Sequence, residues 1–254
     1  MINSTNKYIK HIEQSLIKKA PKKKKEELKK LATYIGTKNR VLGHDTSEVR
    51  KLAKAGWSLN GEGADWLNYA DKLYKGSLVF EVKNTALYLI EYNDKKINEQ
   101  NKFEILPGWI NHTDNWAHSD NLSKFYTRFL ESDSLKEPCF ELLKKWNSDA
   151  DLWKRRQSLV SLFYYAKGKK NFLPYAKSEK MIRNLINDKE YFVQKGLGWA
   201  LRESFHVYPQ ETFNFISKNA EKISSTAFSA ACEKMSIKEK ELLKTKRRKT
   251  RLKN

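Results

Sequence analysis

The sequence predicts an all-α protein built from repeated pairs of helices. Gly and Pro are scarce, at 10 and 5 of 254 residues. Apolar residues recur mostly every three or four positions, the spacing that places them on one face of a helix. Four segments also align with one another at nearly equal intervals along the chain. Together these observations predict an α-solenoid of HEAT-like helix pairs, curved and with a basic concave face.

Two helices are expected within the first 60 residues. The segment "KKEELKKLATYIG" places Leu28, Leu31 and Ile35 on one face and stops at Gly36. The segment "TSEVRKLAKAG" is expected to begin at an N-cap on Thr46 or Ser47 and to end at Gly56. No segment has the alternating pattern of a strand.

The repeat is carried by four aligned segments, each of which opens on an aromatic residue. They are "FEVKNTALYL" from Phe80, "WAHSDNLSKF" from Trp116, "WKRRQSLVSL" from Trp153 and "FVQKGLGWAL" from Phe192. The intervals between their first residues are 36, 37 and 39 residues, the period of a two-helix repeat. We therefore expect residues 1–236 to form one HEAT-like domain.

The charge is strongly positive, with 50 Lys and Arg residues against 30 Asp and Glu residues. A basic surface gains affinity for a polyanion by releasing condensed counterions, so nucleic acid is the expected partner. The alternative is a generally basic proteome, as found in AT-rich bacteria. Residues 237–254 hold nine Lys or Arg residues and two Glu residues, which predicts a basic, disordered tail.

Several classes of protein are disfavoured by what the sequence contains. No run of about 18 apolar residues predicts a membrane span, and the start lacks the apolar region of a signal peptide. The expected location is the cytoplasm, with no membrane partner. Cys139 and Cys232 have no paired spacing and are expected to be buried thiols. His112 and His118 lie near Asp120, but no third ligand stands at metal-binding spacing, so neither a metal nor a cofactor is expected.

The repeat frame also predicts where polar side chains point. Equivalent positions on stacked inner helices face one side, which should then be basic, with one carboxylate and aromatic faces nearby. The residues expected there are Lys83, Asp120, Arg156, Lys195, Trp116 and Trp199. Such a groove is typical of a duplex-binding surface with chemistry at one point.

These segments resemble the HEAT-like-repeat DNA glycosylases of the DNA alkylation repair (AlkD-like) family. The resemblance runs from about residue 26 to about residue 235. It rests on "LATYIGTKNRVLG" with Tyr34, "DNWAHSD" with Trp116 and Asp120, "LWKRR" with Arg156, and "FVQKGLGWALRE" with Trp199. The last segment is the most specific.

The resemblance implies a monofunctional glycosylase that removes N3- or N7-alkylated purines, such as 3-methyladenine and 7-methylguanine, from duplex DNA without flipping the base. The alkylated base is cationic and leaves as a neutral group, so no general acid is needed. Asp120 would stabilise the oxocarbenium-like sugar and orient water, and Trp116 and Trp199 would face that cation. Arg156 would hold a phosphate, and Tyr34 would border the site. A monomer associated with the bacterial nucleoid through DNA is expected.

Alternatives remain open from the residues alone. A shift of one residue would give the phosphate-binding role to Arg155, and both Trp residues fit core packing as well. The family pattern does not account for Ala-His-Ser between Trp116 and Asp120, nor for the long stretch 168–180 between repeats. A non-catalytic DNA-binding relative and a HEAT scaffold for a protein partner are the two competing functions.

Overall fold

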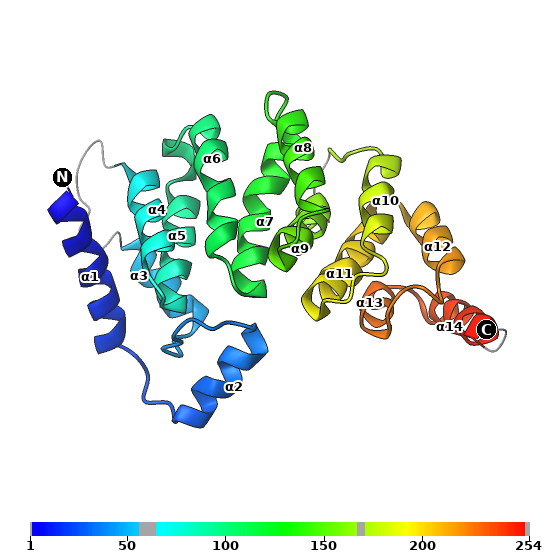
Figure 1. Ribbon diagram of the computed structural model, residues 1–254, viewed down its shortest axis with the longest axis horizontal. Helices are drawn as coiled ribbons and strands as arrows, with labels where there is room; N and C mark the ends of the chain where they lie inside the picture. Colours follow the sequence, from blue (N-terminus) through cyan, green and yellow to red (C-terminus); the bar gives the residue numbers. More distant parts are fainter. Residues whose placement is uncertain (1, 56–64, 167–170, 252–254) are drawn as a thin grey trace. The chain divides into compact units, whose positions relative to one another are not determined.

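The computed structural model describes residues 2–55, 65–166 and 171–251. In these ranges the chain is helical, and the one β-type pairing is an isolated bridge between Arg40 and Val79. The predicted all-α class is confirmed. In chain order the helices are α1 (Ile2–Lys18), α2 (Lys25–Ile35), α3 (Thr46–Lys54), α4 (Trp66–Gly76), α5 (Phe80–Tyr92), η2 (Asp94–Lys96), α6 (Glu99–Ile105), η3 (Leu106–His112), α7 (Trp116–Glu131), α8 (Lys136–Trp146), α9 (Leu152–Phe163), α10 (Tyr175–Asn184), α11 (Tyr191–Val207), α12 (Pro209–Lys218), α13 (Ser225–Ala231) and α14 (Ile237–Arg251) (Figure 1).

The repeat frame matches the helix starts to within one residue. Helices α5 and α7 begin at Phe80 and Trp116, and α9 and α11 begin at Leu152 and Tyr191. Helix α5 packs on α4, α9 packs on α8, and α11 packs on both α9 and α13. The aromatic residue that opens each aligned segment therefore marks the first turn of one helix in each pair.

Contacts divide the chain into two compact units. Unit 1 is Met1–Leu122 and unit 2 is Ser123–Asn254. The boundary falls inside α7, so the first turns of this helix belong to unit 1 and its remaining turns to unit 2.

The helices α5 and α9 form the centre of their units because they are buried on all sides. From Glu81 to Ile90 every residue of α5 is buried, and so is every residue of α9 from Arg156 to Phe163. Polar groups on such helices must be hydrogen-bonded. In unit 2 the Gln157 amide donates to the hydroxyls of Ser123 and Ser161, at 2.7 and 2.9 Å.

Two of the expected helix ends can be compared with the structure. Gly36 caps α2 in the left-handed conformation, with φ of 82°, as predicted. The N-cap of α3 is Asp45 rather than Thr46 or Ser47. Gly56, the expected end of α3, lies outside the described residues. So do residues 168–170 of the long stretch, whose remaining residues lead into α10.

The C-terminal segment differs from the expected disordered tail, because residues 237–251 form α14. Ser236 and Glu239 cap its start: the Ser236 backbone N–H donates to the Glu239 carboxylate at 2.8 Å, and the Glu239 N–H donates to the Ser236 hydroxyl at 3.3 Å. This is the capping box that the sequence "SIKE" encodes. The side chain of Leu243 is only 1% exposed, so it packs α14 against the rest of unit 2.

Both cysteines are free and buried, as expected. Within the described ranges, no helix is long and apolar enough to cross a membrane.

Candidate functional site

The first two turns of α7 carry two of the predicted site residues. Trp116 is the first residue of the helix and Asp120 lies one turn later, so both project from one face. Both side chains are half-buried. The indole N–H of Trp116 donates to the backbone carbonyl of Tyr34 at 2.9 Å, and the two rings meet edge to face with centroids 5.5 Å apart. Tyr34 itself is 69% exposed. The structure thus brings Tyr34 and Trp116 together, beside the turn that carries Asp120.

Asp114 holds the end of α2 against the start of α7. Its carboxylate accepts hydrogen bonds from the Thr37 hydroxyl at 2.9 Å, the Lys38 N–H at 2.7 Å and the side-chain amides of Asn39 and Asn115 at 3.0 and 2.9 Å. Burial raises the pKa of Asp114, but these hydrogen bonds outweigh burial, and the pKa lies below its ordinary value. The loop that follows α2 is therefore bonded to Asp114, which lies two residues before Trp116 in the chain.

We expect Asp114→Asn to destabilise the fold at neutral pH, because an amide cannot accept all of these hydrogen bonds. A lowered pKa in the folded state means that Asp114 stabilises the fold above its ordinary pKa of 3.8 and loses this effect as the pH falls. The expected loss at pH 7 is about 1–3 kcal/mol in the free energy of unfolding. Urea unfolding at pH 7 and pH 3 measures it, and the variant and wild type should converge at the lower pH.

The matched control for this change is Asp133→Asn, which replaces an exposed carboxylate in the turn before α8. It should leave the urea midpoint at pH 7 unchanged. A difference between Asp114→Asn and wild type that persists undiminished at pH 3 would contradict the assignment to the Asp114 carboxylate.

His118, which lies between Trp116 and Asp120, is a residue of the core. The ring of His118 is fully buried and stacks on Phe80 with centroids 4.6 Å apart. The Asn115 amide donates to its Nδ1 at 2.7 Å, so Nε2 carries the proton and donates to the Phe80 carbonyl at 3.2 Å. Burial, reinforced by the charge of Lys83, lowers the pKa of His118 to about 3. His118 is therefore a neutral core residue that ties α7 to α5.

Lys83, which was expected among the DNA contacts, is buried within the fold. It is 3% exposed, its ammonium group donates to the His112 carbonyl at 2.7 Å, and the same group lies 4.9 Å from the centre of the Tyr74 ring. Burial lowers its pKa, while the charge of Asp114 acts in the opposite direction. Lys83 thus joins α5 to the segment before α7.

In unit 2, Trp199 lies half-buried on α11 within a group of aromatic residues. Its ring is tilted against that of Tyr164, with centroids 5.7 Å apart, and the Arg202 guanidinium carbon lies 5.7 Å from its centre. Tyr165 follows, 67% exposed and with a positive φ of 47°. A positive φ is costly for a bulky side chain. The Trp199 ring thus presents a face on which a cation already rests.

The arginines of α9 are engaged inside unit 2. Arg156 is 4% exposed, and its guanidinium donates to the Phe192 carbonyl of α11 at 2.8 Å. Arg155 pairs with Asp188 at 2.7 Å and donates to the carbonyls of Asp149 and Ala150. Arg156, which was expected to hold a phosphate, is therefore buried within the fold. Arg155, the alternative, links the turn before α9 to the turn before α11. Lys195, by contrast, is exposed on α11.

Three residues around the site were missed from the sequence. Asp114 lies in the quoted segment but was not distinguished from its polar neighbours, since its partners at 37–39 are distant in the chain. Tyr164 and Tyr165 form an aromatic pair at the end of a helix, a signal that would have been available next to the "WKRRQSLVSL" segment. Over the described part of the chain, no group of three His, Cys, Asp or Glu side chains is arranged to hold a metal ion.

Comparisons with known proteins agree with this architecture. A family model described as DNA alkylation repair enzyme matches residues 12–235. A predicted DNA alkylation repair enzyme from Enterococcus faecalis is structurally similar, with a TM-score of 0.66 at 19% identity over 85% of this chain and 97% of that one. AlkD2 from Streptococcus mutans is also structurally similar, with a TM-score of 0.51 at 18% identity over 84% of this chain and 99% of that one. Both likenesses concern the fold. A search of curated proteins finds no match.

Proposed function

Because the chain belongs to the DNA alkylation repair enzyme family, we propose that it is a DNA glycosylase acting on N3- and N7-alkylated purines in duplex DNA. The observation that carries the proposal is the start of α7. There an aromatic ring and a carboxylate project one turn apart, and the ring is fixed in place by Tyr34.

The proposed reaction breaks the bond between the sugar C1′ and the alkylated purine nitrogen. The bonding electrons pass to the base, cancel its positive charge and release it as a neutral molecule. A water oxygen then bonds to C1′ and loses a proton, which leaves an abasic deoxyribose. Because the leaving group is already activated by alkylation, the protein need only stabilise positive charge on the sugar and place the water.

Asp120 is the group assigned to both tasks. A carboxylate held near the sugar stabilises the oxocarbenium-like transition state electrostatically, and its oxygens can orient and deprotonate water. The neighbouring Trp116 ring offers an electron-rich face to the same cation. Tyr34 would border the DNA beside Trp116.

Unit 2 offers its own contacts to the DNA. The Trp199 ring carries a cation at its face in the form of Arg202, so the same kind of face is suited to a cationic sugar or base. Lys195 is the exposed cation on α11 and is our proposed phosphate contact there. We leave Lys83 and Arg155 out of the proposed DNA surface because their charged groups are bonded within the fold.

We further propose that the alkylated base stays in the helical stack during the reaction, as the resemblance to the AlkD-like glycosylases implies. An enzyme that flips its target base encloses it in a pocket. A base that stays in the stack is not enclosed in this way, so bulky adducts should be tolerated.

The test is base release from a duplex that contains 7-methylguanine or 3-methyladenine. Incubation with the purified chain should liberate the free alkylated base, detected by chromatography, and leave alkali-labile abasic sites. An undamaged duplex of the same sequence is the control. Binding of the damaged duplex without release of any base would instead identify a non-catalytic DNA-binding protein.

A further inference from the structure

Helix α14 presents a row of cations along one side. Lys240, Lys244, Arg247 and Arg248 follow one another at intervals of four, three and one residues, so they lie on one helix face. Like charges four residues apart on a helix repel each other and destabilise it. The row is nevertheless part of a helix that is capped by Ser236 and buried at Leu243.

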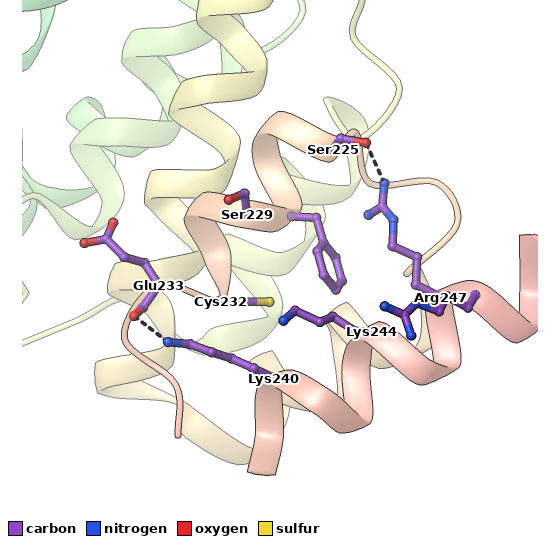
Figure 2. A pocket seen from close by; sticks show the side chains of 9 residues that line it. Ser225, Ser229, Cys232, Glu233, Lys240, Lys244 and Arg247 are labelled. Carbon is purple, nitrogen blue, oxygen red and sulfur yellow. Dashed lines mark hydrogen bonds between the residues drawn. The ribbon is translucent and has the colours of Figure 1, made fainter. Parts of the chain in front are cut away.

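This row faces α13 across a pocket of about 590 Å³. Figure 2 shows Lys240, Lys244 and Arg247 projecting from α14, with Ser225, Ser229 and Cys232 on the α13 side of the same hollow. Arg247 is 7% exposed; it donates to the Ser225 hydroxyl at 3.3 Å and lies 4.5 Å from the centre of the Phe228 ring. The pocket thus has hydroxyl and aromatic groups on one wall and cations on the other.

Carboxylates offset only part of this charge. Glu233, the one acidic residue in the lining, pairs with Arg202 at 2.7 Å and with Lys234 at 3.3 Å. Lys244 pairs with Glu241 at 2.8 Å in an exposed position. The Lys240 ammonium group donates to the Glu233 backbone carbonyl at 3.0 Å, and the Arg247 guanidinium donates to the Ser225 hydroxyl at 3.3 Å.

The pocket at α8 and α10 provides a comparison. Its cations include Lys144, Lys177 and Arg183, and each is paired with a glutamate. Basic side chains line both pockets, but carboxylates balance more of them in the α8–α10 pocket. The positive potential should therefore be higher at the α13–α14 pocket.

Cys232 does not supply the missing negative charge. Burial raises the pKa of its thiol to about 11, although Lys240, Arg247 and Lys244 act in the opposite direction. The thiol is thus protonated and neutral at physiological pH. An anion that enters the pocket meets cations, hydroxyl donors and no thiolate.

From this arrangement we infer that the pocket between α13 and α14 binds backbone phosphates of duplex DNA, as a contact additional to the lesion site. A phosphate diester accepts hydrogen bonds from guanidinium, ammonium and hydroxyl groups, all of which line the pocket. It would also relieve the repulsion along the α14 row. The inference rests on the proposed function in that DNA is the substrate.

The test compares two charge-matched double variants of α14. Lys244→Gln with Arg248→Gln removes two cations from the pocket, whereas Lys238→Gln with Lys246→Gln removes two exposed cations of the same helix that do not line it. Substitution is preferred to truncation because the loss of α14 would uncover the contacts of Leu243. Circular dichroism melting should show all three proteins folded alike.

Binding of an undamaged labelled duplex is measured by fluorescence anisotropy at several salt concentrations. For the pocket variant, the slope of log affinity against log salt should become less steep by about 1–2, as expected for one or two lost phosphate contacts. The control variant should keep the wild-type slope. Equal changes in both variants, or no change in either, would overturn the inference.

Inorganic phosphate is the probe for the competing source of the same chemistry. Saturable phosphate binding that is lost in the pocket variant, together with DNA binding equal to that of the control variant, would show a small-anion site and contradict the DNA assignment. Because the duplex is undamaged, a negative result here does not affect the base-release test, and an absence of base release does not affect the salt slopes.

Discussion

Asp120→Asn is expected to slow the release of 7-methylguanine by about 100- to 1,000-fold, the usual cost of removing one preorganised electrostatic group from an active site. The amide keeps the size of the side chain but carries no charge to stabilise the sugar cation and is a poor base for water. The rate should be measured in single turnover with enzyme in excess, so that chemistry and not product release is observed.

The binding and folding controls separate chemistry from structure. Affinity for an undamaged duplex should be unchanged or higher in Asp120→Asn, because the substitution removes a negative charge from a surface that faces phosphates. Glu131→Gln makes the same chemical change in the last turn of the same helix and should retain the wild-type rate. Equal base release by wild type and Asp120→Asn would exclude the catalytic role of this carboxylate.

Gly198→Ala is expected to destabilise the packing of α11 on α13. A Cβ atom at this position would lie 2.6 Å from the Ala227 carbonyl oxygen, 2.8 Å from the Ala227 Cα and 2.8 Å from the Ala230 Cβ. Two of these atoms belong to the backbone of α13, which packs directly on α11 (Figure 1). The helices must therefore separate, at a cost of about 1–3 kcal/mol in the free energy of unfolding.

The measurement is urea or thermal unfolding, and Gly196→Ala is the matched control on the same helix. Its Cβ would meet side-chain atoms of Arg156, at 3.1 Å from Cγ and 3.3 Å from the guanidinium, which can shift. Replacing a helical Gly by Ala also favours the helix by about 1 kcal/mol. The control should therefore lose less stability than Gly198→Ala; a larger loss in the control would show that the approach of α11 to α13 is not the limiting contact.

Much of the helical framework could be predicted from the sequence. The starts of α5, α7, α9 and α11 follow from one aromatic residue per repeat, and the end of α2 follows from Gly36. These are local properties: the period of apolar residues and the conformational freedom of glycine act within one or two helical turns. The capping box formed by Ser236 and Glu239 is a local signal of the same kind, and it marks the start of α14 where the run of charges alone predicts a disordered tail.

The roles of individual charged residues were less predictable. Lys83 and Lys195 occupy the same position of the repeat frame, yet Lys83 is buried against Tyr74 and Lys195 is exposed. The difference depends on which helix covers each residue, and the period of a single helix contains no information on this. Arg156 is a similar case, because its partner is a carbonyl group 36 positions further along the chain.

The sequence by itself thus determined the all-helical class, the repeat frame and the pairing of Trp116 with Asp120 on one helix face. Only the tertiary structure decided that Asp114 anchors Tyr34 beside Trp116, that His118 is a neutral core residue, and that α14 closes a basic pocket. The physical reason is the range of the interactions. Helix formation depends on neighbours three or four residues away, whereas burial, pKa and hydrogen-bond partners depend on residues that only folding brings together.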